Sequence, residues 1–373
     1  MIDDDELAVE LVADDGGMPR TRRWPLLVLL GAVIAVVVLV GGLDDGGHET
    51  AIPTTTSTLR TTTTQHSTTT GTYVATTTSL PRFESGTGAL LPGATGTFIV
   101  TTDGELVTVI DLSTGARCMN LAGDGAWIPF RSGPITGRAV IGTPRGVATV
   151  DARCSVVQLG GGAEGYPVAI GADGVWMVEP SSGSLIEHRY DSAGGNSIPL
   201  PANTGPSAVE VDGRVVVALN GSMTLVDPAT GRRRDLGAGM PVTAHGSTLA
   251  YTTCPSLECS IVLLDVRTGA RRTIAAEDLA ANSIGAAVFS NDGRYLGLAG
   301  ANGHGAIVDV RTRQVTRLDL PSIAGFTADA AWVLIDDGSR MYAVRPDGTE
   351  QHPITAASRS SNGVAVLLAP PDY

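Results

Sequence analysis

Val109-Ile110-Asp111-Leu112-Ser113-Thr114-Gly115 recurs in close copies along the chain, and this repetition determines the architecture that we expect. The clearest copies are Leu225-Val226-Asp227-Pro228-Ala229-Thr230-Gly231 and Leu264-Asp265-Val266-Arg267-Thr268-Gly269. Each copy is an alternating apolar run that ends in Asp and a tight turn, and a second short run follows it. Alternating apolarity on both sides of turn-forming residues predicts a β-hairpin.

The copies follow one another at a nearly constant spacing. The aligned Asp residues of six copies stand at positions 111, 151, 191, 227, 265 and 309, and the turn of a seventh copy lies near 346. The successive spacings are 40, 40, 36, 38 and 44 residues, and about 37 for the last. A period of about 40 residues that carries four short strands is typical of a propeller blade. The sequence therefore predicts an all-β fold, a seven-bladed β-propeller over residues 89–373.

A propeller must close its ring, because an open ring would expose sheet edges. After the seventh copy the chain adds one more apolar run, Gly363–Ala369. We expect this run to pair with the first blade near Thr97–Val100. Ala89-Leu90-Leu91 competes for the same inner position, but it is shorter and less prone to form a strand.

One copy carries a longer family phrase. Phe289-Ser290-Asn291-Asp292-Gly293-Arg294-Tyr295-Leu296 resembles the F-S-P-D-G-x-x-L phrase of WD40-like and TolB-like propellers, with Asn291 at the position where that family has Pro. The resemblance covers residues 89–369 as architecture and implies a seven-bladed propeller, of a membrane-anchored, actinobacterial type.

Composition excludes several classes of function. All 25 basic residues are Arg, as expected from the GC-rich coding of an actinobacterium, so lysine Schiff bases and a P-loop lysine are ruled out. The formal net charge is −13 without a basic stripe, which argues against a nucleic-acid partner. No cofactor-binding motif is present, and we expect no cofactor and no metal.

Residues 24–43 carry no charge and are almost entirely apolar, with Arg20, Arg22 and Arg23 before them. About 20 such residues in a helix span a bilayer. The arginines predict a single transmembrane helix with a cytoplasmic N-terminus and an extracytoplasmic remainder. A cleaved signal peptide is the alternative, but no small-x-small site follows the apolar run directly.

Two further segments flank this helix. Residues 1–23 are predicted to be a disordered, acidic cytoplasmic tail, because they hold too few apolar residues to build a core. Residues 44–88 are rich in Thr and Ser, with runs such as Thr54-Thr55-Thr56 and Thr68-Thr69-Thr70. We expect these residues to form an unpacked stalk that holds the propeller away from the membrane.

The four cysteines are expected to form structural disulfides, since an even number outside the membrane favours pairing. Cys254 and Cys259 flank one turn of blade five. Cys118 is predicted in the outer strand of blade one and Cys154 after the third strand of blade two, where neighbouring outer edges meet. Reactive thiols or a metal site are the alternatives, but no His lies near either pair in the sequence.

Other conspicuous residues have structural explanations. The histidines form no metal-binding pattern, and no G-x-S-x-G elbow is present. Trp127, Trp176 and Trp332 are expected to pack between blades rather than to form a stacking platform. The run Arg232-Arg233-Arg234 is expected to be a solvated outer edge.

Loops on a rigid scaffold commonly carry binding residues. In a propeller the turns between second and third strands surround one mouth of the central channel. Alignment of the copies places eight residues in these turns, which we call the predicted rim: Asp103, Arg145, Glu179, Asn220, Glu258, His304, Asp336 and Asp337. A mostly acidic rim suits a cation or a basic partner.

Two hypotheses about function remain. The first is a single-pass envelope protein that displays the propeller as a non-catalytic binding or scaffolding module for a protein or glycan. The second is an extracytoplasmic hydrolase, lactonase-like or glycan-active, with its site at the channel mouth. Converging Asp, Glu, Asn or His at the ends of the inner strands would favour the enzyme, and small residues or hydroxyls would favour binding.

Overall fold

The computed structural model describes residues 81–369, without residues 123–125, 129–134, 144–145, 161–165, 180–181, 192–193, 201–206, 255–258, 275–283, 301–303, 319–322, 338 and 355–363. The tail, the predicted transmembrane helix and nearly all of the predicted stalk lie outside this part of the chain. No helix within the described ranges is long and apolar enough to cross a membrane.

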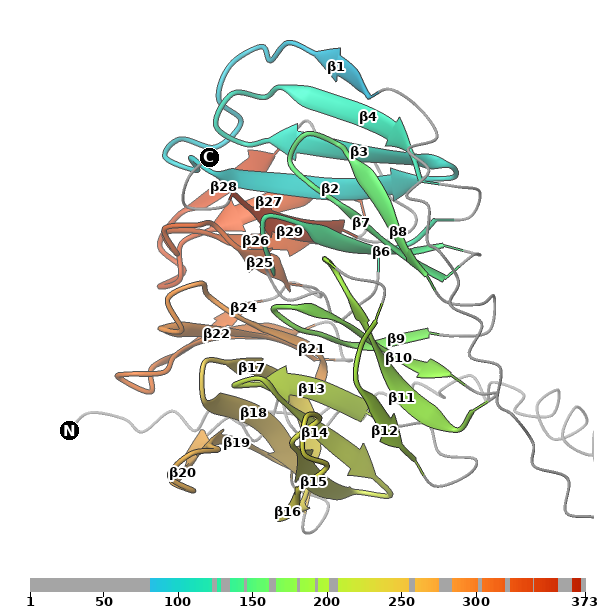
Figure 1. The fold of residues 1–373 in the computed structure, drawn as a ribbon. Coiled ribbons are helices and arrows are strands. Elements are labelled where there is room, and N and C mark those ends of the chain that lie inside the picture. The colour runs from blue at the N-terminus through green and yellow to red at the C-terminus, as the bar shows by residue number, and fades with distance from the viewer. Residues whose placement is uncertain are drawn as a thin grey trace, which may run out of the picture. The chain divides into compact units, whose positions relative to one another are not determined.

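The described chain is a seven-bladed β-propeller, which confirms the predicted fold (Figure 1). Five blades are antiparallel four-stranded sheets whose strands follow chain order from the inside outward. Blade three holds β9 (Tyr166–Ile170), β10 (Gly174–Glu179), β11 (Ser184–Arg189) and β12 (Ser197–Pro199). Blade four holds β13 (Ser207–Val211), β14 (Arg214–Leu219), β15 (Ser222–Val226) and β16 (Arg233–Ala238). Blade five holds β17 (Met240–His245), β18 (Thr248–Thr253), β19 (Ser260–Asp265) and β20 (Arg271–Ile274).

The last two of these five blades follow the same plan. Blade six holds β21 (Ile284–Phe289), β22 (Tyr295–Gly300), β23 (Gly305–Asp309) and β24 (Val315–Leu318). Blade seven holds β25 (Ile323–Phe326), β26 (Val333–Asp336), β27 (Met341–Val344) and β28 (Gln351–Ile354). The third and fourth strands of each blade form the hairpin that the repeat predicts.

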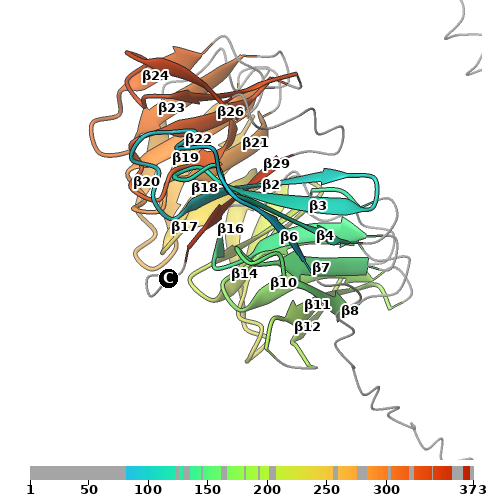
Figure 2. The same cartoon turned by 90° about the horizontal axis from the view of Figure 1, so that it is seen from above.

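The ring closes where the sequence predicts it. Strand β29 (Val364–Leu368) pairs antiparallel with β2 (Thr97–Asp103), with Thr97 opposite Leu368 (Figure 2). Blade one continues outward with β3 (Leu106–Asp111) and β4 (Arg117–Leu121). The competing Leu90 and Leu91 instead donate backbone hydrogen bonds to the carbonyl of Leu112. The later run therefore supplies the innermost strand of the first blade.

Blades one and two carry irregular additions. Strand β1 (Arg82–Glu84) pairs with the outer edge of β4, so these residues belong to blade one and not to the stalk predicted over residues 44–88. Blade two consists of β6 (Ala139–Thr143), β7 (Gly146–Val150) and β8 (Val156–Gly160). Trp127 forms an isolated bridge to Gly142, and the short β5 (Ile135–Thr136) pairs parallel with β29.

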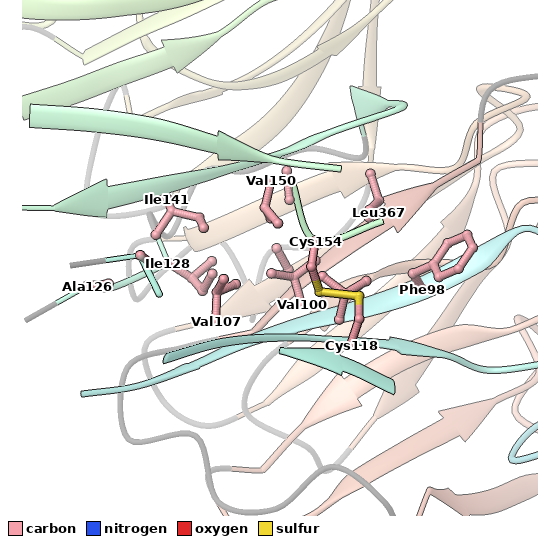
Figure 3. Close-up of a cluster of buried hydrophobic side chains, with 14 residues drawn as sticks. Phe98, Val100, Val107, Cys118, Ala126, Ile128, Ile141, Val150, Cys154 and Leu367 are labelled. Carbon is pink, nitrogen blue, oxygen red and sulfur yellow. A yellow bond between two sulfur atoms is a disulfide. The ribbon is translucent and has the colours of Figure 1, made fainter. Parts of the chain in front are cut away.

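The hydrophobic core is divided among the interfaces between blades. Seven clusters of buried side chains fill the seven successive interfaces of the ring. The cluster between blades one and two includes Val100, Ile141 and the disulfide between Cys118 and Cys154 (Figure 3). Because one residue in two of a strand faces each neighbouring blade, alternating apolarity builds this core directly.

Both predicted disulfides are confirmed. Cys118 pairs with Cys154 and Cys254 pairs with Cys259, and no cysteine remains free within the described residues. The side-chain amide of Asn120 also donates a 2.7 Å hydrogen bond to the carbonyl of Cys154. Covalent and polar contacts thus join blades one and two at their outer strands.

The tryptophans agree with the prediction in two of three cases. Trp176 and Trp332 are buried in the interfaces between blades three and four and between blades seven and one. Trp127 is 37% exposed, and it covers Gly142 of its own blade, where a Cβ atom would lie 2.1 Å from its Cε2. Its indole ring therefore replaces the side chain that the glycine lacks.

Two arginines of the predicted outer edge, Arg233 and Arg234 of β16, also contact the neighbouring blades. The Arg233 guanidinium donates a 3.2 Å hydrogen bond to the carbonyl of Pro199 in blade three. The Arg234 guanidinium donates to the carbonyl of Val266 in blade five. Because neighbouring residues of a strand point to opposite faces, one exposed run ties blade four to both of its neighbours.

The repeated Asp organises the outer turns. The Oδ1 atom of Asp265 accepts hydrogen bonds from the amides of Arg267 and Thr268 at 2.9 and 2.8 Å. The amide of Gly269 donates to the carbonyl of Asp265, and Thr268 accepts from the amide of Ala270. Asp227 and Asp309 make the equivalent amide contacts, so the conserved spacing within the copies reflects an Asx-type turn.

Candidate functional site

The two faces of the propeller carry different turns. In an antiparallel four-stranded sheet the turn between the second and third strands lies at one end, and the other two turns lie at the opposite end. The structure places six members of the predicted rim at the expected turns: Asp103, Glu179, Asn220, His304, Asp336 and Asp337. Arg145 and Glu258 lie outside the described residues. The positions within the blades agree with the alignment, and the binding role of the predicted rim stays a prediction.

Two members of the predicted rim also shape their own turns. Asn220 has a φ of 53° and precedes Gly221 at 79°, so the pair turns the chain between β14 and β15 with left-handed backbone. The Asp337 carboxylate accepts hydrogen bonds from Ser339 and from the amide of Arg340. These bonds, that of the Ser339 side chain first, hold the pKa of Asp337 below its ordinary value.

A cavity of about 470 Å³ opens at the other face, which we call the first-turn face because the turns between first and second strands lie there. The inner strands of blades three to six and the turns that follow them form its walls. The walls are mixed, because Val168, Ile170, Val209, Val242 and Phe289 present apolar surface beside polar side chains such as Glu210 and His245. A concave site that combines apolar surface with placed polar groups can bind a ligand. None of the six described members of the predicted rim lines this cavity.

Glu210 is the most distinctive polar group of the cavity. It stands on inner strand β13, on the face that also carries Ala208, and its half-buried carboxylate crosses to blade three. Its Oε2 atom accepts a 3.0 Å hydrogen bond from Nε1 of Trp176, and Oε1 accepts a 3.3 Å hydrogen bond from the amide of Ala172. A Cβ atom on Gly171 would lie 1.8 Å from Oε2, so a larger residue there would displace the Glu210 carboxylate.

The surroundings of Glu210 favour its neutral form. Burial raises the pKa of the Glu210 carboxyl, and the charges of Glu187 and Asp173 act in the same direction. The hydrogen bonds from Trp176 and Ala172 oppose this shift without cancelling it. Desolvation with a like charge nearby is a common property of functional carboxyl groups, although structural networks also produce it.

A tyrosine supports the turn beneath Glu210. The Tyr190 hydroxyl donates a 3.2 Å hydrogen bond to the carbonyl of Gly171, and its amide donates to the carbonyl of Asp173. The Arg138 guanidinium lies 4.7 Å from the centre of the Tyr190 ring. Burial raises the pKa of Tyr190, so the hydroxyl remains a donor at neutral pH. Tyr190, the residue after β11, thereby holds the turn of blade three through two hydrogen bonds.

The remaining charged or ionisable groups of the cavity, Asp212 and His245, contact residues of blades five and six. Asp212, on the turn after β13, pairs with Arg267 on the outer turn of blade five. His245, at the end of β17, packs against Phe289 with ring centroids 6.0 Å apart and against Gly293. Glu210 thus lies in the interface between blades three and four, and His245 in the interface between blades five and six. Within the described ranges, no three His, Cys, Asp or Glu side chains are arranged to hold a metal ion.

The repeat predicts the strands of each blade but gives no sign of this cavity. Residues 208–210 of inner strand β13 and 242–245 of inner strand β17 line it. Glu210 interrupts the first of these runs, and a lone carboxyl in an inner strand was the signal that could have identified it. The identity of its partner could not be predicted, because Trp176 lies 34 residues away in another blade.

No family model and no curated protein matches the chain. Solved structures that are similar to it include AztD from Citrobacter koseri, at 13% identity, 73% coverage of this chain and 96% of that chain, with a TM-score of 0.47. TolB from Acinetobacter baumannii is similar at 14% identity, 74% and 83% coverage and a TM-score of 0.44. BamB from Moraxella catarrhalis is similar at 16% identity, 68% and 80% coverage and a TM-score of 0.39.

Proposed function

We propose that the chain is a single-pass membrane protein of the bacterial cell envelope that displays its propeller outside the membrane as a non-catalytic binding or scaffolding module. The apolar run at residues 24–43 and the arginines before it support the anchor and its orientation. The Thr-rich stretch that follows supports a spacer between membrane and propeller. The two disulfides fit an oxidising compartment.

The observation that carries the non-catalytic assignment is that the carboxylates of the cavity already serve the fold. Glu210 holds Trp176 and the amide of Ala172, and Asp212 holds Arg267. A general acid or base must reach the proton of a bound substrate, and a hydrolase needs such groups to converge. Here the bonds within the fold and the separation of Glu210 and His245 into different interfaces favour binding.

The alternative function is a hydrolase with its site at the channel mouth, lactonase-like or glycan-active. The desolvated carboxyl of Glu210 is the one feature that favours it, because a raised pKa suits a general acid. A second carboxyl or a nucleophile beside Glu210 would be needed to complete such a site. Among the described lining residues the second carboxyl is Asp212, which Arg267 engages, and the hydroxyls of Thr243 and Ser290 stand on blades five and six.

The partner at the propeller is a protein or a glycan under this proposal, and either face could receive it. The predicted rim offers acidic turns on a rigid ring, and the first-turn face offers the cavity. Proximity labelling in the native cell tests the proposal, with the labelling enzyme fused after residue 373 of the full chain. A second fusion directly after residue 80 is the matched control, since it keeps the anchor and the Thr-rich stretch without the propeller.

We expect the full chain to label a set of envelope proteins or glycan-processing proteins that the control does not label. Identical sets from both fusions would contradict a binding role for the propeller. Turnover of an ester, lactone or glycoside panel by the purified chain, lost in Glu210→Gln, would contradict the non-catalytic assignment and favour the hydrolase.

A further inference from the structure

The charge of the cavity at the first-turn face points to the kind of group that it accepts. Glu210 and Asp212 are the carboxylates among its described lining residues, and neither Arg nor Lys belongs to that lining. Asp173 and Glu187 add negative potential at Glu210, as their effect on its pKa shows. Arg267 pairs with Asp212 and so balances that carboxylate of the lining, and Arg138 stacks on Tyr190, but no ion pair among the described residues involves Glu210.

The Glu210 carboxylate retains capacity for a ligand. An ionised carboxylate offers about four acceptor positions, and Trp176 and Ala172 occupy two of them. Burial without a counter-charge disfavours its ionised form. A cation that enters the cavity would supply the missing counter-charge, and a charge-assisted hydrogen bond to the carboxylate is stronger than a neutral one.

The walls of the cavity determine what the cation is attached to. Val168, Ile170, Val209 and Val242 present aliphatic surface, and Phe289 adds an aromatic ring. A volume of about 470 Å³ admits an aliphatic chain of several carbons. We propose that this cavity binds an alkylammonium group, with the charge at Glu210 and the chain along the apolar walls. The inference rests on the proposed binding function and names the chemistry of one ligand.

The alkylammonium group could belong to a free amine or to a lysine side chain of a partner protein. Three probes of equal chain length separate charge from apolar contact: 1-aminohexane, 1-hexanol and hexanoate. Calorimetry on the purified full chain should show the amine binding about tenfold or more tightly than the alcohol, and the carboxylate should bind more weakly than both. Backbone-capped lysine, added as a fourth probe, distinguishes a free amine from a lysine side chain as the source.

Glu210→Gln is the diagnostic variant, because it removes the charge and keeps the shape and one acceptor for Trp176. It should abolish the preference for the amine and leave the binding of 1-hexanol unchanged. Asp227→Asn, on an outer turn beyond the cavity lining, is the matched control and should keep the preference. If Glu210→Gln does not fold, Asp212→Asn at the cavity mouth replaces it, with a smaller loss of the same preference expected.

Equal affinities for amine and alcohol, a preference for hexanoate, or an unchanged amine preference in Glu210→Gln would overturn the inference. These outcomes are separate from a failure of the proposed function. If the propeller labels specific partners but shows no preference for the amine, only the alkylammonium inference is refuted. If the protein turns over its ligand, the non-catalytic assignment is refuted.

Discussion

The Asp212 carboxylate of blade four accepts a 2.7 Å hydrogen bond from Nε of Arg267, which lies on the outer turn of blade five. Asp212 holds a left-handed backbone conformation, with φ of 54°, at the turn beside the cavity. The ion pair therefore links an inner turn at the cavity to the repeated Asp turn at the periphery. Two adjacent blades are joined on the same face that the cavity opens on.

Removal of Arg267 should change the titration of Asp212. The hydrogen bond from Arg267 is the main reason that the pKa of Asp212 lies below its ordinary value. A carboxyl with a lowered folded-state pKa contributes stability above pH 3.8, and this contribution is lost as the pH falls through the folded-state pKa. We expect Arg267→Gln to move the pKa of Asp212 back toward 3.8 and to weaken the acid dependence of stability.

Carboxyl NMR titration of the two proteins measures this shift directly. Arg232→Gln is the matched control, because Arg232 is an exposed arginine on the outer turn of blade four that is not among the groups acting on the pKa of Asp212, so this pKa should stay unchanged. Salt should reproduce part of the effect in the parent chain, since exposed ion pairs are screened. An Asp212 that titrates identically with and without Arg267 would contradict the assignment.

The closing strand β29 packs closely against β25, and this contact should leave no room for an added methyl group. A Cβ atom at Gly325 of β25 would lie 2.7 Å from Cγ2 of Val366 in β29. Gly325→Ala should therefore lower the free energy of unfolding by about 1–3 kcal/mol through overpacking. Urea denaturation measures the loss. Gly194→Ala is the control, because nothing lies within 4 Å of a Cβ atom there.

A second substitution tests the cause of that loss. Val366→Ala shortens the side chain that the new methyl group would meet. In the Gly325→Ala background it should recover part of the lost stability, although Val366→Ala alone leaves a void and destabilises. Two losses that simply add would indicate that the two residues do not contact each other in the closed ring.

The two disulfides should differ in their contribution to stability. Cys118 and Cys154 enclose 36 residues, whereas Cys254 and Cys259 are 5 residues apart. In the chain-entropy account the longer loop contributes about 4 kcal/mol and the shorter about 2 kcal/mol. Replacing both cysteines of one pair by Ala should therefore cost more at 118 and 154. Paired urea titrations compare the variants, and the reverse order would refute the expectation.

The outer turn of blade six places an arginine in a left-handed backbone conformation that favours glycine. Gly115, Gly231 and Gly269 have φ between 69° and 80°, and Arg313 occupies the matching position of blade six with φ of 65°. A left-handed residue other than glycine costs about 1–2 kcal/mol, and glycine adds about 0.5–1 kcal/mol of chain entropy. Arg313→Gly should stabilise by about 0.5 kcal/mol, and Gly269→Ala should destabilise.

Thermal and urea unfolding of both variants give the signs. The amide of Arg313 donates to the carbonyl of Asp309, as the amide of Gly269 does to Asp265, so the turn geometry is retained in either variant. If both substitutions change the free energy of unfolding in the same direction, the left-handed backbone conformation does not explain the effect of either residue.

The sequence predicted the elements that local residues determine. Asp265 and Thr268 satisfy the amides of their own turn, so each copy of the phrase contains the information for its hairpin. The spacing of about 40 residues between copies then predicted seven blades. The pairing of Thr97 with Leu368 was also predictable, because a ring with one unpaired strand has one vacant inner position.

Side-chain hydrogen bonds between blades could not be predicted in the same way. The partners of Glu210, Arg233 and Arg234 lie in other copies, and their choice depends on side-chain reach and not on periodicity. Strand β1 gave no sequence signal, because its three residues are exposed and pair only with the free edge of β4. The cavity depends on four blades at once, so its volume and lining require the assembled ring.

Strand β29 also has a consequence for biosynthesis. A ribosome makes β2, β3 and β4 long before it makes the segment that completes their sheet. Blade one therefore keeps an unpaired inner edge, at Thr97–Thr101, while six further blades are translated. Such an edge invites pairing with another nascent chain. A chaperone that shields Thr97–Thr101 until β29 emerges would thus protect this protein against aggregation during its synthesis.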